Sequence, residues 1–423
     1  MSYWAVDAAA GYGKTFRLMQ VLGEALVKQP LKEGQKVLAL TFMHGSRRRL
    51  NEKLRSVPGL NGCYACMTID SLAWRLRERW WSLGGLLGFP PPGAVGAFDA
   101  ECEFAAMLLR EGAVQQWTAS SFPIVVVDEA QDLTSARLEM VAALGGIAQV
   151  FLAADEFQCL NPTLRPNPLA QWLPTVCKPE TLPKPMRTNV AALLNAAVAV
   201  REGKAPPSEG KFKIMAGSSV PLASAQLANA IRWSGGGSIA IIAPSTQSKF
   251  VREVVLRVQT EPSGKNKDLG PYAIRWEESD RDELAKLGGL AEMPEACSIS
   301  AAVGLLRSLP RSGPTEQTIA WLLRTASTTG RADTTSAEVA AQLQRFISIR
   351  RQQAKAAERG ILAMTVHQAK NREFDGVVVM WPFEFKADDE GKRRLLYNAV
   401  TRARRWCSVI VQSAGMLKSA PFT

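Results

Sequence analysis

The stretch Tyr3–Thr15, YWAVDAAAGYGKT, decides the fold. It opens on β-favouring residues, continues with small residues around Gly11 and Gly13, and is followed by a helical pattern over residues 16–28. A strand, a glycine-bearing loop and a helix in this order predict a phosphate-binding loop, because small residues let successive backbone N–H groups face phosphate oxygens. An ordinary turn between a strand and a helix is the alternative.

Each residue of this loop suits a nucleotide triphosphate. The loop backbone would surround the phosphates, the Lys14 ammonium would neutralise the β- and γ-phosphates, and the Thr15 hydroxyl would bind Mg²⁺. The predicted nucleotide-binding residues are therefore Ala10, Gly11, Tyr12, Gly13, Lys14 and Thr15.

Strands and helices go on alternating after the loop. Apolar runs at residues 36–42, 64–69, 122–129 and 150–155 predict a first parallel sheet, and runs at 238–244, 360–365, 377–380 and 407–411 predict a second. We expect an α/β protein with two domains, residues 1–203 and 204–423. Each would carry a small helical insertion, at about 74–122 and 278–359 respectively.

Acidic and amide side chains follow two of the predicted strands. Asp128 and Glu129 end the apolar run 122–127, where Asp128 would hold Mg²⁺ and Glu129 would activate the attacking water as general base. The alternative is a helix N-terminal cap, which also favours acidic residues. Gln158, after the next strand, would sense the γ-phosphate and orient water.

Arginines are the other candidates for catalysis. A phosphoryl-transfer transition state spreads negative charge over the γ-phosphate oxygens, and planar guanidinium groups stabilise it. Arg187 and Arg402 stand in the sequence contexts PKPMRTN and AVTRAR. For any single arginine, a solvated surface or an ordinary ion pair is the more frequent role.

The composition agrees with a nucleic-acid partner. The 423 residues include 51 Lys and Arg against 39 Asp and Glu, a net charge of +12, which favours polyanionic partners. A basic helix over residues 46–55 would bind phosphate backbone, or be a solvated helix face. Only two histidines are present, which excludes a His-rich metal centre. No apolar run reaches the roughly 18–20 residues of a membrane span, and no signal-peptide pattern is present. We therefore expect a cytoplasmic protein without membrane contact.

These motifs together resemble superfamily 1 helicases of the UvrD/Rep/PcrA type, in a compact form. Asp128–Asp132, DEAQD, matches that family's DExQD signature. Residues 365–375 resemble its motif V and residues 396–404 its motif VI, and six motifs follow the family order from Ala8 to Arg404.

The resemblance implies two RecA-like P-loop NTPase domains with parallel sheets, and ATP and Mg²⁺ as cofactors. It implies that Glu373 meets the nucleotide ribose and that Gln131 couples ATP to DNA. Nucleic-acid contacts are implied for Thr41, Phe42, Thr68, Thr365 and His367. For Phe42, a core position at the end of a strand is the alternative. The sequence departs from the family pattern in four places. The adenine-reading glutamine of the family's Q motif is absent before Ala8, and Met186 replaces an adenine-stacking tyrosine, which leaves the choice of nucleotide open. Cys159 replaces a DNA-stacking aromatic, and Asn371-Arg372 replaces Gly-Leu.

The first functional hypothesis is an ATP-dependent, 3′-to-5′ single-stranded DNA translocase or helicase acting on single-stranded or partial-duplex DNA. The second is an ATP- or DNA-sensing regulatory subunit of a nuclease or antiviral complex, with little unwinding of its own. A partner nuclease or repair protein is expected under the second hypothesis. The two predicted domains fill most of the chain, so accessory domains must be small.

Overall fold

The computed structural model describes residues 3–42, 44–89, 98–263, 268–277, 293–309, 311–354 and 360–423. By internal contacts, the chain forms two compact units. The first unit comprises residues 1–4, 18–152 and 278–357, and the second comprises 5–17, 153–277 and 358–423. The division at residue 203 stays a prediction.

The first sheet has the strand order β1-β5-β4-β2-β3. Its strands are β1 (Tyr3–Asp7), β2 (Val37–Thr41), β3 (Tyr64–Thr68), β4 (Ile124–Asp128) and β5 (Gln149–Ala154). β2 pairs in parallel with β3 and β4, and β4 pairs in parallel with β5. Every residue of β2 and β4 is buried, which explains their unbroken apolar runs: helices cover both faces of a parallel sheet.

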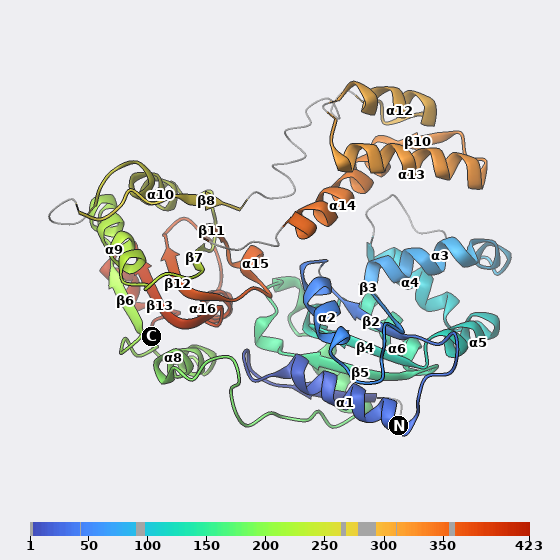
Figure 1. Ribbon diagram of the computed structural model, residues 1–423, viewed down its shortest axis with the longest axis horizontal. Helices are drawn as coiled ribbons and strands as arrows, with labels where there is room; N and C mark the ends of the chain where they lie inside the picture. Colours follow the sequence, from blue (N-terminus) through green and yellow to red (C-terminus); the bar gives the residue numbers. More distant parts are fainter. Residues whose placement is uncertain are drawn as a thin grey trace. The chain divides into compact units, whose positions relative to one another are not determined.

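Six helices accompany this sheet among the described residues (Figure 1). They are α1 (Lys14–Lys28), α2 (His44–Arg55), α3 (Ile69–Leu86), α4 (Phe98–Leu108), α5 (Gly112–Ser121) and α6 (Ser135–Gly145). Helix α1 buries Leu18, Leu22 and Leu26, whose four-residue spacing puts them on one face. The segment predicted as a helical insertion, residues 74–122, is helical over much of its described part. Residues 90–97 of this segment lie outside the described residues.

The second sheet is parallel throughout, in the order β6-β13-β12-β7-β11-β8. The strands are β6 (Phe212–Ala216), β7 (Ile239–Ala243), β8 (Ile274–Trp276), β11 (Ile361–Thr365), β12 (Phe374–Trp381) and β13 (Ala403–Val411). Helices α8 (Ala191–Arg201) and α16 (Asp389–Val400) pack on one face, and α9 (Val220–Arg232) and α10 (Lys249–Thr260) on the other. Short elements complete the unit: α7 (Pro168–Val176), α15 (Val366–Ala369) and the 3₁₀ turns η2 (Glu156–Gln158), η3 (Pro162–Leu164) and η5 (Ala414–Lys418).

The segment between β8 and β11 forms a small helical body that groups with the first unit. Its elements are β9 (Ala296–Ser298), α12 (Ile299–Ser308), α13 (Gly313–Thr329), β10 (Asp333–Thr335) and α14 (Ser336–Ala354). Strands β9 and β10 pair antiparallel, and α14 contacts α2. The predicted helical insertion at 278–359 includes residues 278–292, 310 and 355–359, which lie outside the described residues.

The predicted fold class is confirmed. Two parallel sheets, each covered by helices, form the two RecA-like cores expected from the sequence. Among the described residues, no helix combines the length and apolar character needed to cross a membrane.

Candidate nucleotide and nucleic-acid site

The loop after β1 has the backbone that its glycines predict. Gly11 and Gly13 have φ values of 82° and 85°, in the left-handed region that favours glycine. A Cβ at Gly13 would overlap the sulfur of Met186, and a Cβ at Gly11 would lie 3.0 Å from the Arg187 Cβ. Both glycines are therefore required by backbone conformation and by close packing.

The segment around Arg187 lies directly on this loop. The backbone N–H groups of Met186 and Arg187 donate to the Gly11 carbonyl oxygen at 2.7 and 2.9 Å. Met186, which stands where the family has an adenine-stacking tyrosine, is 59% exposed. An exposed thioether provides an apolar surface beside the loop, without the flat ring that stacks on a base.

Lys14 points back over the loop that precedes it. Its ammonium donates to the carbonyl oxygens of Ala8 and Ala9 at 2.9 and 3.3 Å and lies 3.7 Å from Asp155 Oδ2. The side chain is only 10% exposed. The loop thus holds one cation against its own carbonyl groups, where a phosphate chain would contact it.

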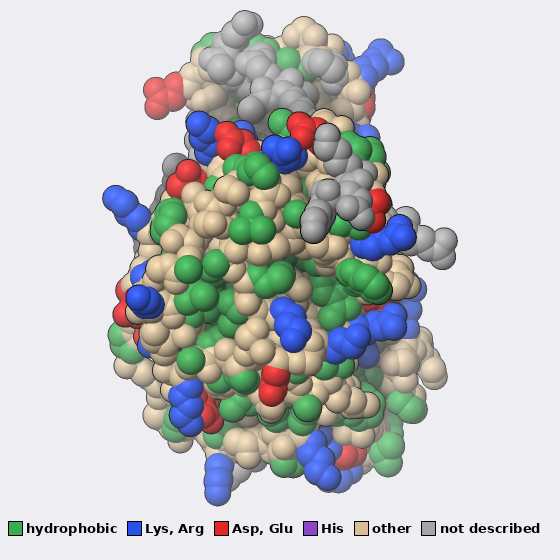
Figure 2. Space-filling view, turned by 90° about the vertical axis from the view of Figure 1, so that its left-hand side faces the viewer, with side chains coloured by type: hydrophobic (Ala, Val, Ile, Leu, Met, Phe, Trp, Pro, Cys, Tyr) green, Lys and Arg blue, Asp and Glu red, His purple; other side chains and the backbone are tan. Residues whose placement is uncertain are grey.

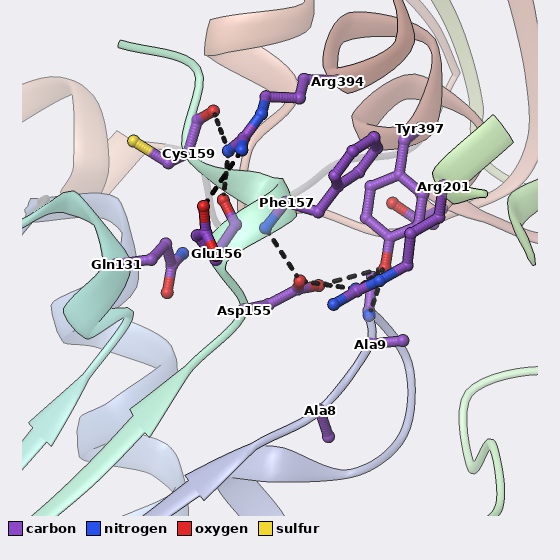
Figure 3. A network of polar contacts seen from close by, with 12 residues as sticks. Ala8, Ala9, Gln131, Asp155, Glu156, Phe157, Cys159, Arg201, Arg394 and Tyr397 are labelled. Atoms are coloured by element: carbon purple, nitrogen blue, oxygen red, sulfur yellow. Dashed lines mark hydrogen bonds and ion pairs between the residues drawn. The ribbon is translucent and has the colours of Figure 1, made fainter. Parts of the chain in front are cut away.

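Asp155, at the end of β5, joins the loop to two distant helices (Figure 3). This carboxylate is fully buried and lies 2.8 Å from Arg201 Nη1, and it accepts a hydrogen bond from the Tyr397 hydroxyl at 3.1 Å. The Tyr397 hydroxyl in turn accepts from the Ala10 N–H at 2.7 Å. One hydrogen-bonded chain therefore connects the loop, the end of β5, and helices α8 and α16.

Burial and the charge of Asp155 set the pKa values of the residues in this hydrogen-bonded network. Burial disfavours the charged form of Arg201, but the Asp155 carboxylate outweighs it, so the pKa of Arg201 is raised. Burial and the neighbouring Asp155 charge both raise the pKa of Tyr397. Arg201 therefore stays charged. Tyr397 stays a neutral phenol that donates one hydrogen bond to Asp155 and accepts two, from the Ala10 N–H and from Arg201 Nη1 at 3.3 Å.

The turn that contains Gln158 is held by Arg394 of α16. The Arg394 guanidinium donates to the carbonyl oxygens of Glu156 and Cys159 and stacks over the Phe157 ring at 5.1 Å (Figure 3). Gln158 itself is buried, 3% exposed. Arg394, Arg201 and Tyr397 were not predicted as site residues. Only the position of Tyr397 inside the motif VI segment signalled it, since two arginines among 51 Lys and Arg carry no local signal.

The acidic pair lies in the first unit. Asp128 ends β4 and is 8% exposed, and its Oδ1 accepts the Glu129 N–H at 3.2 Å. Glu129 has a φ of 59°, which is uncommon for a residue with a side chain and recurs at functional sites. The Gln131 amide donates to Glu129 Oε2 at 2.5 Å, which fixes the carboxylate.

The predicted magnesium ligands are oxygen donors, as that ion requires. Mg²⁺ in nucleotide sites takes one or two protein oxygens together with phosphates and waters, and the Thr15 hydroxyl and Asp128 carboxylate are of this kind. Among the described residues, no group of three or more His, Cys, Asp or Glu side chains is placed to hold a metal ion.

Arg187 and Glu373 are brought together in the second unit. Arg187 Nε lies 2.9 Å from Glu373 Oε1, and Arg187 Nη1 donates to the Thr401 carbonyl at 2.7 Å. Glu373 also pairs with Arg404 at 2.7 Å. Arg402 is 2% exposed and donates to the Asn398 carbonyl at 3.0 Å and to the Thr401 hydroxyl at 3.2 Å.

The predicted nucleic-acid residues fall at the ends of strands in both units. In the first unit, Thr41 is fully buried, and Phe42 lies under the Arg137 guanidinium at 5.2 Å. Thr68 is the N-cap of α3 and accepts the Ser71 N–H at 3.1 Å. The capping role of Thr68 is a structural task that sequence reasoning did not foresee.

In the second unit, Thr365 is the N-cap of the short helix α15, which carries His367. Thr365 and Gln368 form a reciprocal capping box, which fixes the direction of the chain as it leaves β11. Loss of solvation and the nearby Lys370 charge lower the pKa of His367, so its imidazole is neutral at pH 7. The departure at Asn371 also has a structural explanation: its φ is 61°, where the family's glycine fits easily and asparagine is tolerated.

Two family models match the chain. Residues 2–162 match an AAA domain, and residues 360–410 match the UvrD-like helicase C-terminal domain. No match is found among curated proteins.

Two solved structures are similar at low identity. A crystal structure of Arterivirus nonstructural protein 10 (helicase) is 11% identical, with a TM-score of 0.38, over 97% of this chain and 59% of the viral chain. The complex of the same viral helicase with DNA is 12% identical, with a TM-score of 0.38, over 98% and 61%. The chain thus spans about three fifths of the viral proteins. The two family models, one at each end of the ordered motifs, support the resemblance of this chain to UvrD-like helicases of superfamily 1.

Proposed function

We propose that the protein hydrolyses ATP and uses the energy to move along single-stranded DNA in the 3′-to-5′ direction, opening partial duplexes as it moves. The matches to an AAA domain and to a UvrD-like helicase C-terminal domain support nucleotide use and nucleic-acid binding. Direction, DNA preference and the residue roles are part of the proposal.

In the proposed reaction, the loop backbone orients the triphosphate and Lys14 neutralises charge on the β- and γ-phosphates. Glu129 orients the attacking water and takes its proton. Bound Mg²⁺, held through Thr15 and Asp128, would stabilise charge on the phosphate oxygens. Arg187 and Arg402 would stabilise the transition state, which requires Arg187 to exchange Glu373 and the Thr401 carbonyl for the γ-phosphate.

The Ala10–Tyr397–Asp155 chain carries the proposal. The Ala10 N–H belongs to the predicted phosphate-binding loop, and here it donates to Tyr397 of the motif VI segment. A phosphate that takes this N–H displaces the Tyr397 hydroxyl and alters the Asp155 network beside Gln158. Nucleotide binding thereby changes contacts of the turn that carries Gln158 and of the motif VI segment, the kind of two-state contact that couples hydrolysis to movement.

The test is ATP hydrolysis with and without oligo(dT), comparing wild-type protein with Lys14→Ala. We expect oligo(dT) to stimulate the wild type and Lys14→Ala to lose hydrolysis, because the β- and γ-phosphates lose their cation. Lys249→Ala, an exposed lysine on α10, is the matched control. Equal ATP hydrolysis by Lys14→Ala and wild type would refute the mechanism. Strand displacement on substrates with a 3′ or a 5′ single-stranded tail then tests direction.

A second candidate is a regulatory subunit that hydrolyses ATP on DNA but unwinds little. The observation that favours it is the turn after Gln158, where Cys159 is buried and no aromatic side chain replaces the family's DNA-stacking ring. Active DNA-stimulated hydrolysis without strand displacement, restored by a partner nuclease or repair protein, would favour this candidate.

A further inference from the structure

A cavity of about 550 Å³ lies in the first unit, beside the predicted nucleic-acid residues. Phe42 and Thr68, at the ends of β2 and β3, line one part of it. Trp74 of α3, Trp321 of α13 and Arg345 of α14 line the rest. The insertion between β8 and β11 therefore completes a pocket over residues for which the family resemblance implies DNA contacts.

Arg345 places a positive charge in this cavity. Its guanidinium lies 5.3 Å from the Trp74 ring centroid, and its Nη2 donates to the Ser71 hydroxyl at 3.5 Å. No carboxylate of the described residues pairs with it. Burial and the positive charges of Arg75 and Arg47 lower its pKa, and the negative charge of Asp70 offsets them only in part. Removing an arginine from water beside two other arginines costs free energy, which an anion at this position would offset.

The acidic side chains of the cavity do not supply that anion. Each has an arginine partner of its own: Asp70 pairs with Arg137 at 2.8 Å, Glu338 with Arg331 at 2.5 Å, and Glu101 with Arg77. Arg345, Arg47 and Arg75 are left as a group of like charges at one end of the cavity. The positive charge at this end of the cavity thus favours a ligand with an anionic group.

The aromatic residues that line the cavity favour a ligand with a planar ring. Phe42, Trp74 and Trp321 provide three rings around one cavity, and its volume falls in the roughly 300–1,000 Å³ of small-ligand pockets. Aromatic rings beside cations form the usual site for unstacked bases of a single strand. By contrast, on the face seen in Figure 2, basic side chains are scattered among apolar and neutral ones.

We propose that this cavity binds one nucleotide of the single strand, with its base against the aromatic rings and its phosphate at Arg345, assisted by Arg47 and Arg75. The proposal rests on the proposed function, because it makes the cavity part of the DNA path. It assigns a task to α14: the insertion closes a base pocket over Phe42 and Thr68.

The first test measures binding of fluorescein-labelled oligo(dT) by fluorescence anisotropy at several salt concentrations. Arg345→Gln is expected to weaken binding roughly tenfold or more, because a hydrogen bond to a charged group is lost. The plot of log K against log salt should become less steep by about 0.7, the value for one phosphate contact on a single strand. Arg324→Gln, an exposed arginine on α13 of the same insertion, is the control and should bind like wild type.

The second test separates a binding role from a structural one. Trp74→Ala should weaken oligo(dT) binding about 5- to 100-fold, and Trp74→Phe should restore most of it, because the phenyl ring still stacks. Arg345→Gln should leave the melting temperature unchanged or raise it, since it removes an uncompensated charge. A structural arginine would instead lower the melting temperature when removed.

If Arg345→Gln and Arg324→Gln bind oligo(dT) with equal affinity and equal salt dependence, the proposal that this cavity binds a nucleotide is wrong. That outcome leaves the proposed function intact if DNA-stimulated hydrolysis persists. Conversely, wild-type protein that binds oligo(dT) through Arg345 without stimulated hydrolysis would support the pocket and refute the motor. ATP hydrolysis without DNA should be unchanged in the control Arg324→Gln, whose side chain is exposed on α13.

Discussion

Replacing Tyr397 by phenylalanine removes a single oxygen atom from the centre of the second unit. That hydroxyl accepts the Ala10 N–H at 2.7 Å and Arg201 Nη1 at 3.3 Å, and it donates to Asp155 at 3.1 Å. Tyr397 is 1% exposed. The ring remains, with its edge-to-face contact to Phe157 at 5.1 Å. The variant therefore tests the three hydrogen bonds of the hydroxyl with little change in packing.

The expected loss of stability depends on which groups lose their hydrogen-bond partner when the Tyr397 hydroxyl is removed. Asp155 keeps its ion pair with Arg201 at 2.8 Å and its hydrogen bond from the Phe157 N–H at 3.2 Å, so the carboxylate stays paired in the variant. The Ala10 N–H loses its acceptor, and an unsatisfied buried donor costs about 1–3 kcal/mol. For a domain of this size, that corresponds to a fall of about 2–12 °C in melting temperature.

The assay is thermal unfolding with and without ATP. A phosphate that takes the Ala10 N–H no longer competes with Tyr397 in the variant, so ATP should raise the melting temperature of Tyr397→Phe more than that of wild type. Tyr272→Phe is the control, because the Tyr272 hydroxyl makes no hydrogen bond among the described residues. Its stability should stay within about 0.5 kcal/mol of wild type.

Two results would refute this reasoning. Equal melting temperatures for Tyr397→Phe and Tyr272→Phe without ATP would mean that the Ala10 N–H is not held as described. A destabilised Tyr397→Phe that gains no more from ATP than wild type does would mean that ATP does not use this N–H.

Three further outcomes are expected. Glu129→Gln should slow ATP hydrolysis about 10²- to 10⁴-fold while ATP binding persists, as single-turnover and binding measurements can separate. Asn371→Gly should be close to neutral in thermal unfolding, whereas Asn371→Ala should cost about 1 kcal/mol, because only glycine and asparagine readily adopt a φ of 61°. Arg372→Leu should cost about 3–5 kcal/mol, since Glu277 is 10% exposed and loses the cation 3.2 Å away. The double variant with Glu277→Leu should recover part of that loss, and a loss equal to the sum of the two single variants would contradict the pairing.

Local chemistry explains why much of the fold could be predicted. Apolar runs such as residues 124–127 mark buried parallel strands, because both faces of such a strand are covered. Gly11 and Gly13 mark the loop, because few other residues adopt its backbone. The roles of the predicted site residues stay predictions, although Arg187 and Glu373, far apart in sequence, do lie together.

By itself, then, the sequence determined the strand–loop–helix start, the α/β class and the order of the motifs. Only the tertiary structure determined which side chains pair with the buried charged groups. Asp155 is paired with Arg201, 46 residues on, and bonded to Tyr397, 242 residues on, while Arg345 reaches Ser71 across 274 residues. The physical reason is range: backbone conformation and hydrophobic periodicity act over a few residues, whereas the desolvation of a charge is compensated by whichever partner the folded chain brings near.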